Sequence, residues 1–219
     1  MSVTRRSLAT AVAAAATLAL AGASSASAQT APAPVVCDGT LSGVTVGDVT
    51  VRYDKSCTLT NVVVEGTVTG RLGSGTITLD RTAVSGDVTT TGHRLVATTA
   101  AVGGDVVATE SDQGVVVSQS VVRGDVTVSA PQGELRLGSL ESSRYGNVIG
   151  GTLKVDTAFV DGVVARNVVA GGLLLTGNQA AIEVRRNIVR GALDCQGNAP
   201  DPIGGSNLAS SKLGQCSAL

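Results

Sequence analysis

Three regularly spaced aspartates are the first residues in this sequence that suggest chemistry. Asp87, Asp105 and Asp125 each follow a glycine, and successive members are 18 and 20 residues apart. Carboxylates held close together repel one another, and a divalent cation could bridge them. The calcium-binding repeat GGxGxDxUx is absent. The aspartates are therefore candidate metal ligands, with solvated surface residues as the alternative.

Two further motifs suggest activities that the rest of the sequence does not favour. Arg123-Gly124-Asp125 is the tripeptide that integrins bind at mobile loop tips. His93 is the single histidine, so any Ser-His or Cys-His mechanism would depend on it alone. The sequence holds no Gly-x-Ser-x-Gly motif and no phosphate-binding loop. We assign no catalytic residue and no cofactor.

A repeat of the form apolar-x-Gly-x-apolar determines how these residues are placed. Its spacings are 19, 20, 18, 20, 27, 20 and 20 residues, and its glycines are Gly47, Gly66, Gly86, Gly104, Gly124, Gly151, Gly171 and Gly191. The positions two before and two after each glycine are apolar, apart from Thr45, which indicates a strand with one buried face. A second short strand starts nine residues before most of the glycines, as in "CTL", "ITL" and "VVV".

About 20 residues with two or three short strands form one coil of a parallel β-helix, which buries its apolar face only by stacking. We therefore predict an all-β fold, a right-handed parallel β-helix of about eight coils, because right-handed crossovers are the rule. A left-handed hexapeptide helix is the rival, but an apolar residue at every sixth position is missing. In this fold the Arg-Gly-Asp tripeptide lies in or beside a strand, not at a mobile tip.

Asparagines recur four residues before the last three repeat glycines. Asn147, Asn167 and Asn187 should stack at a bend, where amide side chains can bond one another along the axis and satisfy the turn backbone. A structural ladder is our interpretation, and a polar ligand site is the alternative.

The four cysteines form two pairs, and the two members of each pair are about one coil apart in the sequence. Cys37 and Cys57 are 20 residues apart, and Cys195 and Cys216 are 21 apart. Stacked positions on adjacent coils lie about 5 Å apart, within the Cα range of a disulfide. We predict the pairs Cys37–Cys57 and Cys195–Cys216, which close the first and last coils. The spacing is not that of a zinc site.

The one long spacing marks a lengthened turn at 138–146, "GSLESSRYG". It is about seven residues longer than its equivalents and carries Glu141, Arg144 and Tyr145, one of only three aromatic residues. Long turns on rigid repeats often carry function, and a ring beside charged groups could hold a sugar or peptide. We predict the candidate binding loop here; a tolerated surface insertion is the alternative.

The N-terminus predicts export. Residues 1–28 combine Arg5 and Arg6, an Ala-rich apolar stretch and a final "ASA", the pattern of a cleaved signal peptide. "TRRSLA" is similar to a twin-arginine signal, and the export route stays open. We expect a flexible segment at 29–36, the β-helix at 37–195, and a cap and tail at 196–219. No later stretch is long and apolar enough for a transmembrane helix.

Charge excludes one class of partner. Without Arg5 and Arg6, 14 basic residues face 17 acidic ones, which argues against nucleic-acid binding. The disulfides and the Pro-containing polar cap "NAPDPIGGSN" indicate a monomer, because they protect the end coils from pairing.

The coils and the ending together resemble a group of secreted actinobacterial β-helix proteins, whose coils read V-x-G-(N/D)-V. The ending "L-x-C-x-G-N-x-P … N … G-x-C" is matched by Leu193, Cys195, Gly197, Asn198, Pro200, Asn207, Gly214 and Cys216. This resemblance implies fold and export but no reaction. The coils also look like those of bactofilins, which polymerise end to end, are typically cytosolic and lack this signal and these cysteines.

We therefore expect a secreted, non-enzymatic structural or binding protein of the cell envelope or extracellular space. Its partner would be a cell-wall glycan or another envelope protein. The alternatives are a pectate-lyase-like polysaccharide enzyme and a self-assembling filament subunit. An enzyme of that kind needs carboxylates and basic groups along one groove, and no lysine column accompanies the aspartates.

Overall fold

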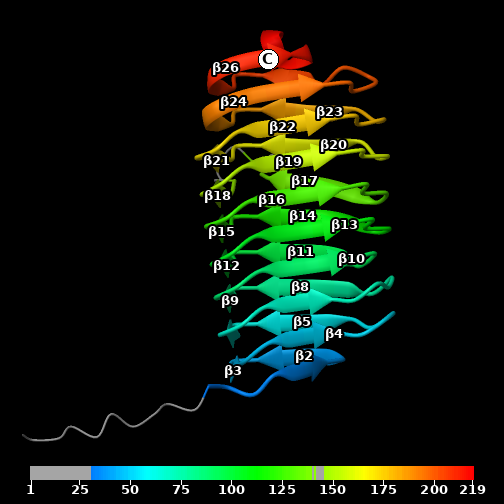
Figure 1. Cartoon of the computed structure of the whole chain (residues 1–219), viewed down its shortest axis with the longest axis vertical. Coiled ribbons are helices and arrows are strands. Elements are labelled where there is room, and N and C mark those ends of the chain that lie inside the picture. Colours follow the sequence, from blue (N-terminus) through cyan, green and yellow to red (C-terminus); the bar gives the residue numbers. More distant parts are fainter. Residues whose placement is uncertain (1–30, 140, 142–145) are drawn as a thin grey trace, which may run out of the picture. The chain divides into compact units, whose positions relative to one another are not determined.

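Stacked turns of parallel strands form the whole fold of residues 31–219 (Figure 1). The computed structural model describes residues 31–139, 141 and 146–219. Each turn contributes one strand to a nine-stranded sheet, so the described chain makes about nine turns, close to the prediction of about eight. All strand pairs are parallel, which confirms the solenoid. None of the described helices is long and apolar enough to cross a membrane.

A turn has three strands separated by three bends. The nine-stranded sheet consists of β2 (Gly39–Ser42), β5 (Cys57–Thr60), β8 (Thr76–Asp80), β11 (Arg94–Thr98), β14 (Gly114–Ser118), β17 (Glu134–Gly138), β20 (Gly162–Ala165), β23 (Ile182–Arg185) and β25 (Ile203–Gly205). A first bend, which we call the ladder bend because it contains the predicted asparagines, leads from each of these strands to a two-residue strand.

The short strands and the third strands of each turn belong to one larger sheet. The short strands are β3 (Thr45–Val46), β6 (Val63–Val64), β9 (Ala83–Val84), β12 (Ala101–Val102), β15 (Val121–Val122), β18 (Val148–Ile149) and β21 (Val168–Val169). The third strands are β1 (Val35–Cys37), β4 (Val49–Val51), β7 (Val68–Gly70), β10 (Val88–Thr91), β13 (Val106–Thr109), β16 (Val126–Ser129), β19 (Leu153–Asp156) and β22 (Leu173–Thr176). The long strands β24 (Ile188–Gln196) and β26 (Leu208–Gly214) continue both rows, and a 3-10 helix, η1 (Gln215–Ala218), follows.

Two more bends complete the turn. The glycine bend, between short and third strands, contains the repeat glycines. The return bend leads from each third strand to the next strand of the nine-stranded sheet. Residues 203–214, which we expected in the cap, supply two strands to the stack.

Inward side chains form a continuous column of aliphatic residues. On the short strands the second residue is buried, as with Val64, Val122 and Val169, while the first is exposed. The period-two pattern is therefore confirmed, with one correction in the first turn. Thr45 pairs with Val63 and is exposed, and Val46 takes the buried position. The alignment on Gly47 was off by one because this glycine bend is one residue shorter than the next.

Candidate binding site

The two ends of the lengthened turn are bonded to adjacent residues of the next turn of the solenoid. Ser139 N–H donates to the Ala165 carbonyl at 3.1 Å, and Gly146 N–H donates to the Arg166 carbonyl at 3.1 Å. Gly138 has a φ of 103°, and a Cβ there would lie 1.8 Å from the Ala165 oxygen. The extra residues therefore leave and re-enter the stack at one point. Arg144 and Tyr145 lie outside the described residues.

A hollow of about 370 Å³ opens beside this turn. Three successive strands of the nine-stranded sheet, β11, β14 and β17, end there, and the turn itself forms one side. Polar groups dominate the lining, which consists of Thr98, Ser118, Gln119, Arg136, Gly138, Ser139 and Glu141. The structure thus places Glu141, a predicted binding residue, on the wall of a cavity. Hydroxyl, amide, guanidinium and carboxylate groups together suit a hydroxyl-rich ligand.

Arg136 on β17 and Arg94 on β11 share one carboxylate, that of Glu134. Its Nη2 lies 3.5 Å from Glu134 Oε1, and Arg94 Nη2 lies 2.7 Å from Glu134 Oε2. Arg94 reaches Glu134 across the side-chain-free Gly114, because their strands flank β14. Only Arg136 of the two arginines lines the hollow. It is therefore the basic group positioned for a ligand there.

The aspartate column is part of the glycine bend. Asp87 Oδ1 accepts the N–H of Asp105 at 2.8 Å, and Asp105 Oδ1 accepts the N–H of Asp125 at 2.8 Å. Asp125 Oδ1 in turn accepts the N–H of Thr152 at 2.6 Å. Each carboxylate thus satisfies a backbone donor of the following turn. Within the described residues, no group of three or more His, Cys, Asp or Glu is arranged to hold a metal ion.

The same contacts explain why glycine recurs. A Cβ on Gly104 would lie 1.9 Å from Asp87 Oδ1, and one on Gly124 would lie 1.9 Å from Asp105 Oδ1. An aspartate on one turn therefore requires a glycine on the next. Both columns are visible in the sequence, but their coupling is not.

The Arg-Gly-Asp tripeptide lies on the glycine bend between β15 and β16. Arg123 N–H donates to the Val102 carbonyl at 3.0 Å, and Gly124 N–H donates to the Gly104 carbonyl at 3.1 Å. Its aspartate is engaged with the following turn through Thr152. The tripeptide is therefore a product of the repeat rather than a displayed loop tip.

The asparagines of the ladder bend form one buried hydrogen-bonded column. Asn147 Nδ2 donates to Asn167 Oδ1, and Asn167 Nδ2 donates to Asn187 Oδ1, both at 3.0 Å. Asn207, which we had noted only in the ending motif, extends the column with another 3.0 Å bond from Asn187. All four are at most 3% exposed, so the column has no face open to a ligand.

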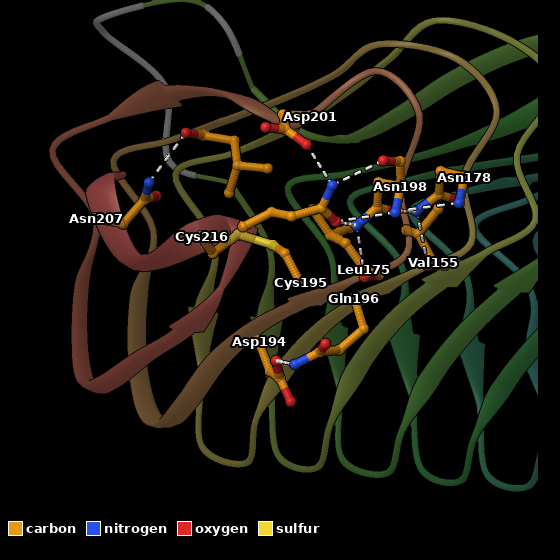
Figure 2. The surroundings of a disulfide bond; sticks show 12 residues. Val155, Leu175, Asn178, Asp194, Cys195, Gln196, Asn198, Asp201, Asn207 and Cys216 are labelled. Atoms are coloured by element: carbon orange, nitrogen blue, oxygen red, sulfur yellow. Dashed lines mark hydrogen bonds between the residues drawn. A yellow bond between two sulfur atoms is a disulfide. The ribbon is translucent and has the colours of Figure 1, made fainter.

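The return bend holds a second column of amide side chains, which we did not predict from the sequence. Asn178 Nδ2 donates to Asn198 Oδ1 at 2.7 Å, and Asn198 Nδ2 donates to Gln215 Oε1 at 2.9 Å. Figure 2 shows this column where it meets the last turn, beside Cys195. The 20-residue spacing between Asn178 and Asn198 was the available signal.

Both predicted disulfides are present, one near each end of the stack. Cys37 bonds to Cys57 with Cα atoms 5.6 Å apart, and Cys195 bonds to Cys216 with Cα atoms 5.2 Å apart. Figure 2 shows the second bond joining β24 to η1.

His93 is fully buried, so it is inaccessible to a substrate. Its Nδ1 lies 3.2 Å from the Thr91 carbonyl oxygen, and its Nε2 has no hydrogen-bond partner. The imidazole lies beside the inward-facing Gly70, where a Cβ would come within 3.3 Å of Nδ1. His93 thus fills core volume that small neighbours leave open.

The fold and the bonds at its two ends define the class, a disulfide-closed parallel β-solenoid. Comparison of the chain with protein-family models, with curated proteins and with solved structures finds no match.

Proposed function

We propose that this chain is a secreted, non-enzymatic rod that binds a glycan segment of the cell envelope in the hollow beside 138–146. The observation that carries the proposal is the coincidence of two features. The one spacing that departs from the repeat adjoins a hollow of about 370 Å³ with a polar lining. Stacking alone does not require the extra residues, because their stems meet at neighbouring backbone positions.

Export is part of the proposal. The signal-like residues 1–28 support it, as do two disulfides, which persist in oxidising compartments. Kinship with the secreted actinobacterial β-helix group belongs to the same proposal. N-terminal sequencing of the exported protein should give a chain that begins at Gln29; an intact Met1 on the exported form would contradict the signal peptide.

A rod without catalysis fits the described groups better than a polysaccharide lyase does. The single histidine is buried, and one oxygen of each column aspartate accepts a backbone N–H. A filament subunit is less favoured because both end turns are closed by disulfides.

The binding proposal can be tested with two matched arginines. Purified, oxidised protein is applied to a glycan array and to insoluble peptidoglycan. Arg136→Gln should weaken binding about tenfold or more, since a charge-assisted hydrogen bond contributes about 1.5–3 kcal/mol. Arg94→Gln disturbs the same Glu134 pair but lies outside the hollow, so it should bind like the wild type. Equal losses in both variants, or none in either, would reject this site.

A further inference from the structure

The short strands display an apolar stripe along the solenoid. Their first residues are in register from turn to turn and are all exposed. We call this set the stripe: Val63, Ala83, Ala101, Val121, Val148, Val168, Ile188 and Leu208. Its six larger members are 38% to 67% exposed.

Stacking does not require these residues to be apolar. The core is filled by the alternate residue of each short strand. Strand propensity is met elsewhere by threonine, since the outward positions of the third strands include Thr50, Thr69, Thr89 and Thr127. A contiguous exposed apolar surface usually marks an interaction site. The stripe therefore indicates a surface that associates with another molecule.

The stripe is not uniform, and its two halves are complementary in shape. Around Ala83 and Ala101 the surface forms a hollow of about 420 Å³, which is also lined by Val84, Ser85, Val102, Gly103, Val121 and Arg123. In the C-terminal half the same positions carry Val168 and Ile188, whose exposed fractions are 38% and 49%. The N-terminal half thus has a depression at Ala83 and Ala101, and the C-terminal half carries larger side chains at the corresponding positions, which we call the ridge.

We propose that two copies of this chain dock antiparallel, stripe against stripe. A two-fold axis between the turns of Val121 and Val148 places Ala101 opposite Val168 and Ala83 opposite Ile188 of the second copy. The ridge of each copy then fills the hollow of the other. A parallel arrangement would place hollow against hollow and ridge against ridge.

Among the charges beside the stripe, Arg190 favours this orientation, whereas the Arg123 side chains of the two copies lie one turn apart beside the axis. Arg190 lies two residues beyond Ile188, is exposed and has no ion-pair partner among the described residues. In this dimer the turn that carries Arg190 faces the turn that carries the exposed Asp87 of the second copy. Glu65 of that copy lies one turn further along. On the other edge Arg186 approaches Arg81, whose charge is compensated by Asp80 at 2.6 Å.

The size of the stripe predicts a reversible dimer. Eight turns at about 4.8 Å and a width of about 10 Å give about 400 Å² per copy, or about 800 Å² in total. Interfaces below about 1,200 Å² are typically weak and transient. This dimer replaces the monomer that the end caps indicated, because the caps block growth at the ends but leave the stripe uncovered.

Sedimentation equilibrium of the oxidised protein from 1 to 500 µM tests the proposal. The wild type should change from monomer to dimer within this range, and Ile188→Lys should raise the dissociation constant at least tenfold. Phe159→Lys is the matched control, since Phe159 is also about half exposed, at 51%, but lies on the return bend. It should leave the dimer intact. A wild type that stays monomeric at 500 µM, or equal effects of the two lysines, would overturn the dimer.

A charge reversal tests the orientation. Arg190→Glu should weaken the dimer about threefold or more, and adding Glu65→Arg in the same chain should restore it. In a parallel dimer these positions are six turns apart, about 29 Å, and could not compensate one another. Failure of the rescue would therefore overturn the antiparallel arrangement. Circular dichroism should show all variants folded, because every substituted side chain is exposed.

Discussion

The N-terminal and C-terminal halves of this solenoid build the same turn with different hydrogen bonds. In the N-terminal half, exposed aspartates of the glycine bend accept backbone N–H groups of the next turn. In the C-terminal half the aspartates stop, and buried asparagines of the ladder and return bends take over. The ladder bend of the N-terminal half instead holds Val62, Thr82, Ala100 and Ser120. A fixed backbone therefore does not dictate which bend carries the polar column.

The difference predicts unequal contributions to stability. An asparagine amide both donates and accepts, so each residue inside a column links three turns and leaves several groups unpaired when removed. An exposed carboxylate only accepts, and water can replace it. We expect the C-terminal columns to be the more sensitive.

The largest effect should follow from breaking the middle of the ladder. Asn167→Ala removes the acceptor of Asn147 N–H and Nδ2, and it leaves the Leu137 carbonyl without its donor. Unpaired buried polar groups cost about 1–3 kcal/mol each, so unfolding should become easier by about 4 kcal/mol. Urea denaturation measures this. A loss below about 1 kcal/mol would show that the two halves are equivalent.

A smaller effect should come from the coupled glycine bend of the N-terminal half. Gly124→Ala forces the new methyl group onto Asp105 Oδ1 and should cost about 2–3 kcal/mol. Gly172→Ala is the control, since its Cβ would meet nothing closer than 3.3 Å. Combining Gly124→Ala with Asp105→Ala should cost less than the sum of the two single changes. Strict additivity in this cycle would contradict the coupling.

Removal of one aspartate should matter less than removal of one asparagine. Asp105→Ala loses the acceptor of Asp125 N–H at an exposed site, for about 1 kcal/mol. Asp105→Asn keeps an acceptor oxygen and removes a charge from the column, so it should be within about 0.5 kcal/mol of the wild type. An Asp105→Asn penalty as large as that of Asp105→Ala would indicate that the charge itself is needed, as a bound cation would require.

The smallest effect concerns Asp54 in the return bend. Hydrogen bonds from the backbone and then the hydroxyl of Ser74 lower the pKa of this carboxyl below its ordinary value. A lowered pKa in the folded protein means stability that is present above the unfolded-state value and is lost as the pH falls through the folded one. The stability difference between wild type and Asp54→Ala should therefore shrink below about pH 4. A difference that grows on acidification would contradict the sign.

The repeat made the stack predictable, because glycine spacing and period-two apolar columns encode the coil directly. The cysteine pairs followed from the same spacing. The ninth turn was missed because residues 203–214 lack the repeat glycine, and Val46 was misplaced because one bend is a residue shorter. The Asn178 column escaped notice because only Asn198 and Gln215 continue it.

The position of the hollow was predictable, but most of the residues that line it were not. The long spacing located the turn at 138–146, and Glu141 does line the hollow. Arg136, Thr98 and Ser118 could not be found this way, since their sequence positions are ordinary outward strand positions. They come together only because β11, β14 and β17 lie side by side on three successive turns.

Deletion of residues 140–146 is the most direct test of a function carried by an insertion on a self-sufficient stack. It removes seven residues and restores the 20-residue spacing, with Ser139 in the position that Arg166 occupies on the next turn. Thermal unfolding should stay within a few degrees of the wild type, while binding to peptidoglycan or to any array glycan that the wild type retains should be lost. Unchanged binding by a folded deletion variant, or loss of the folded stack, would contradict the account.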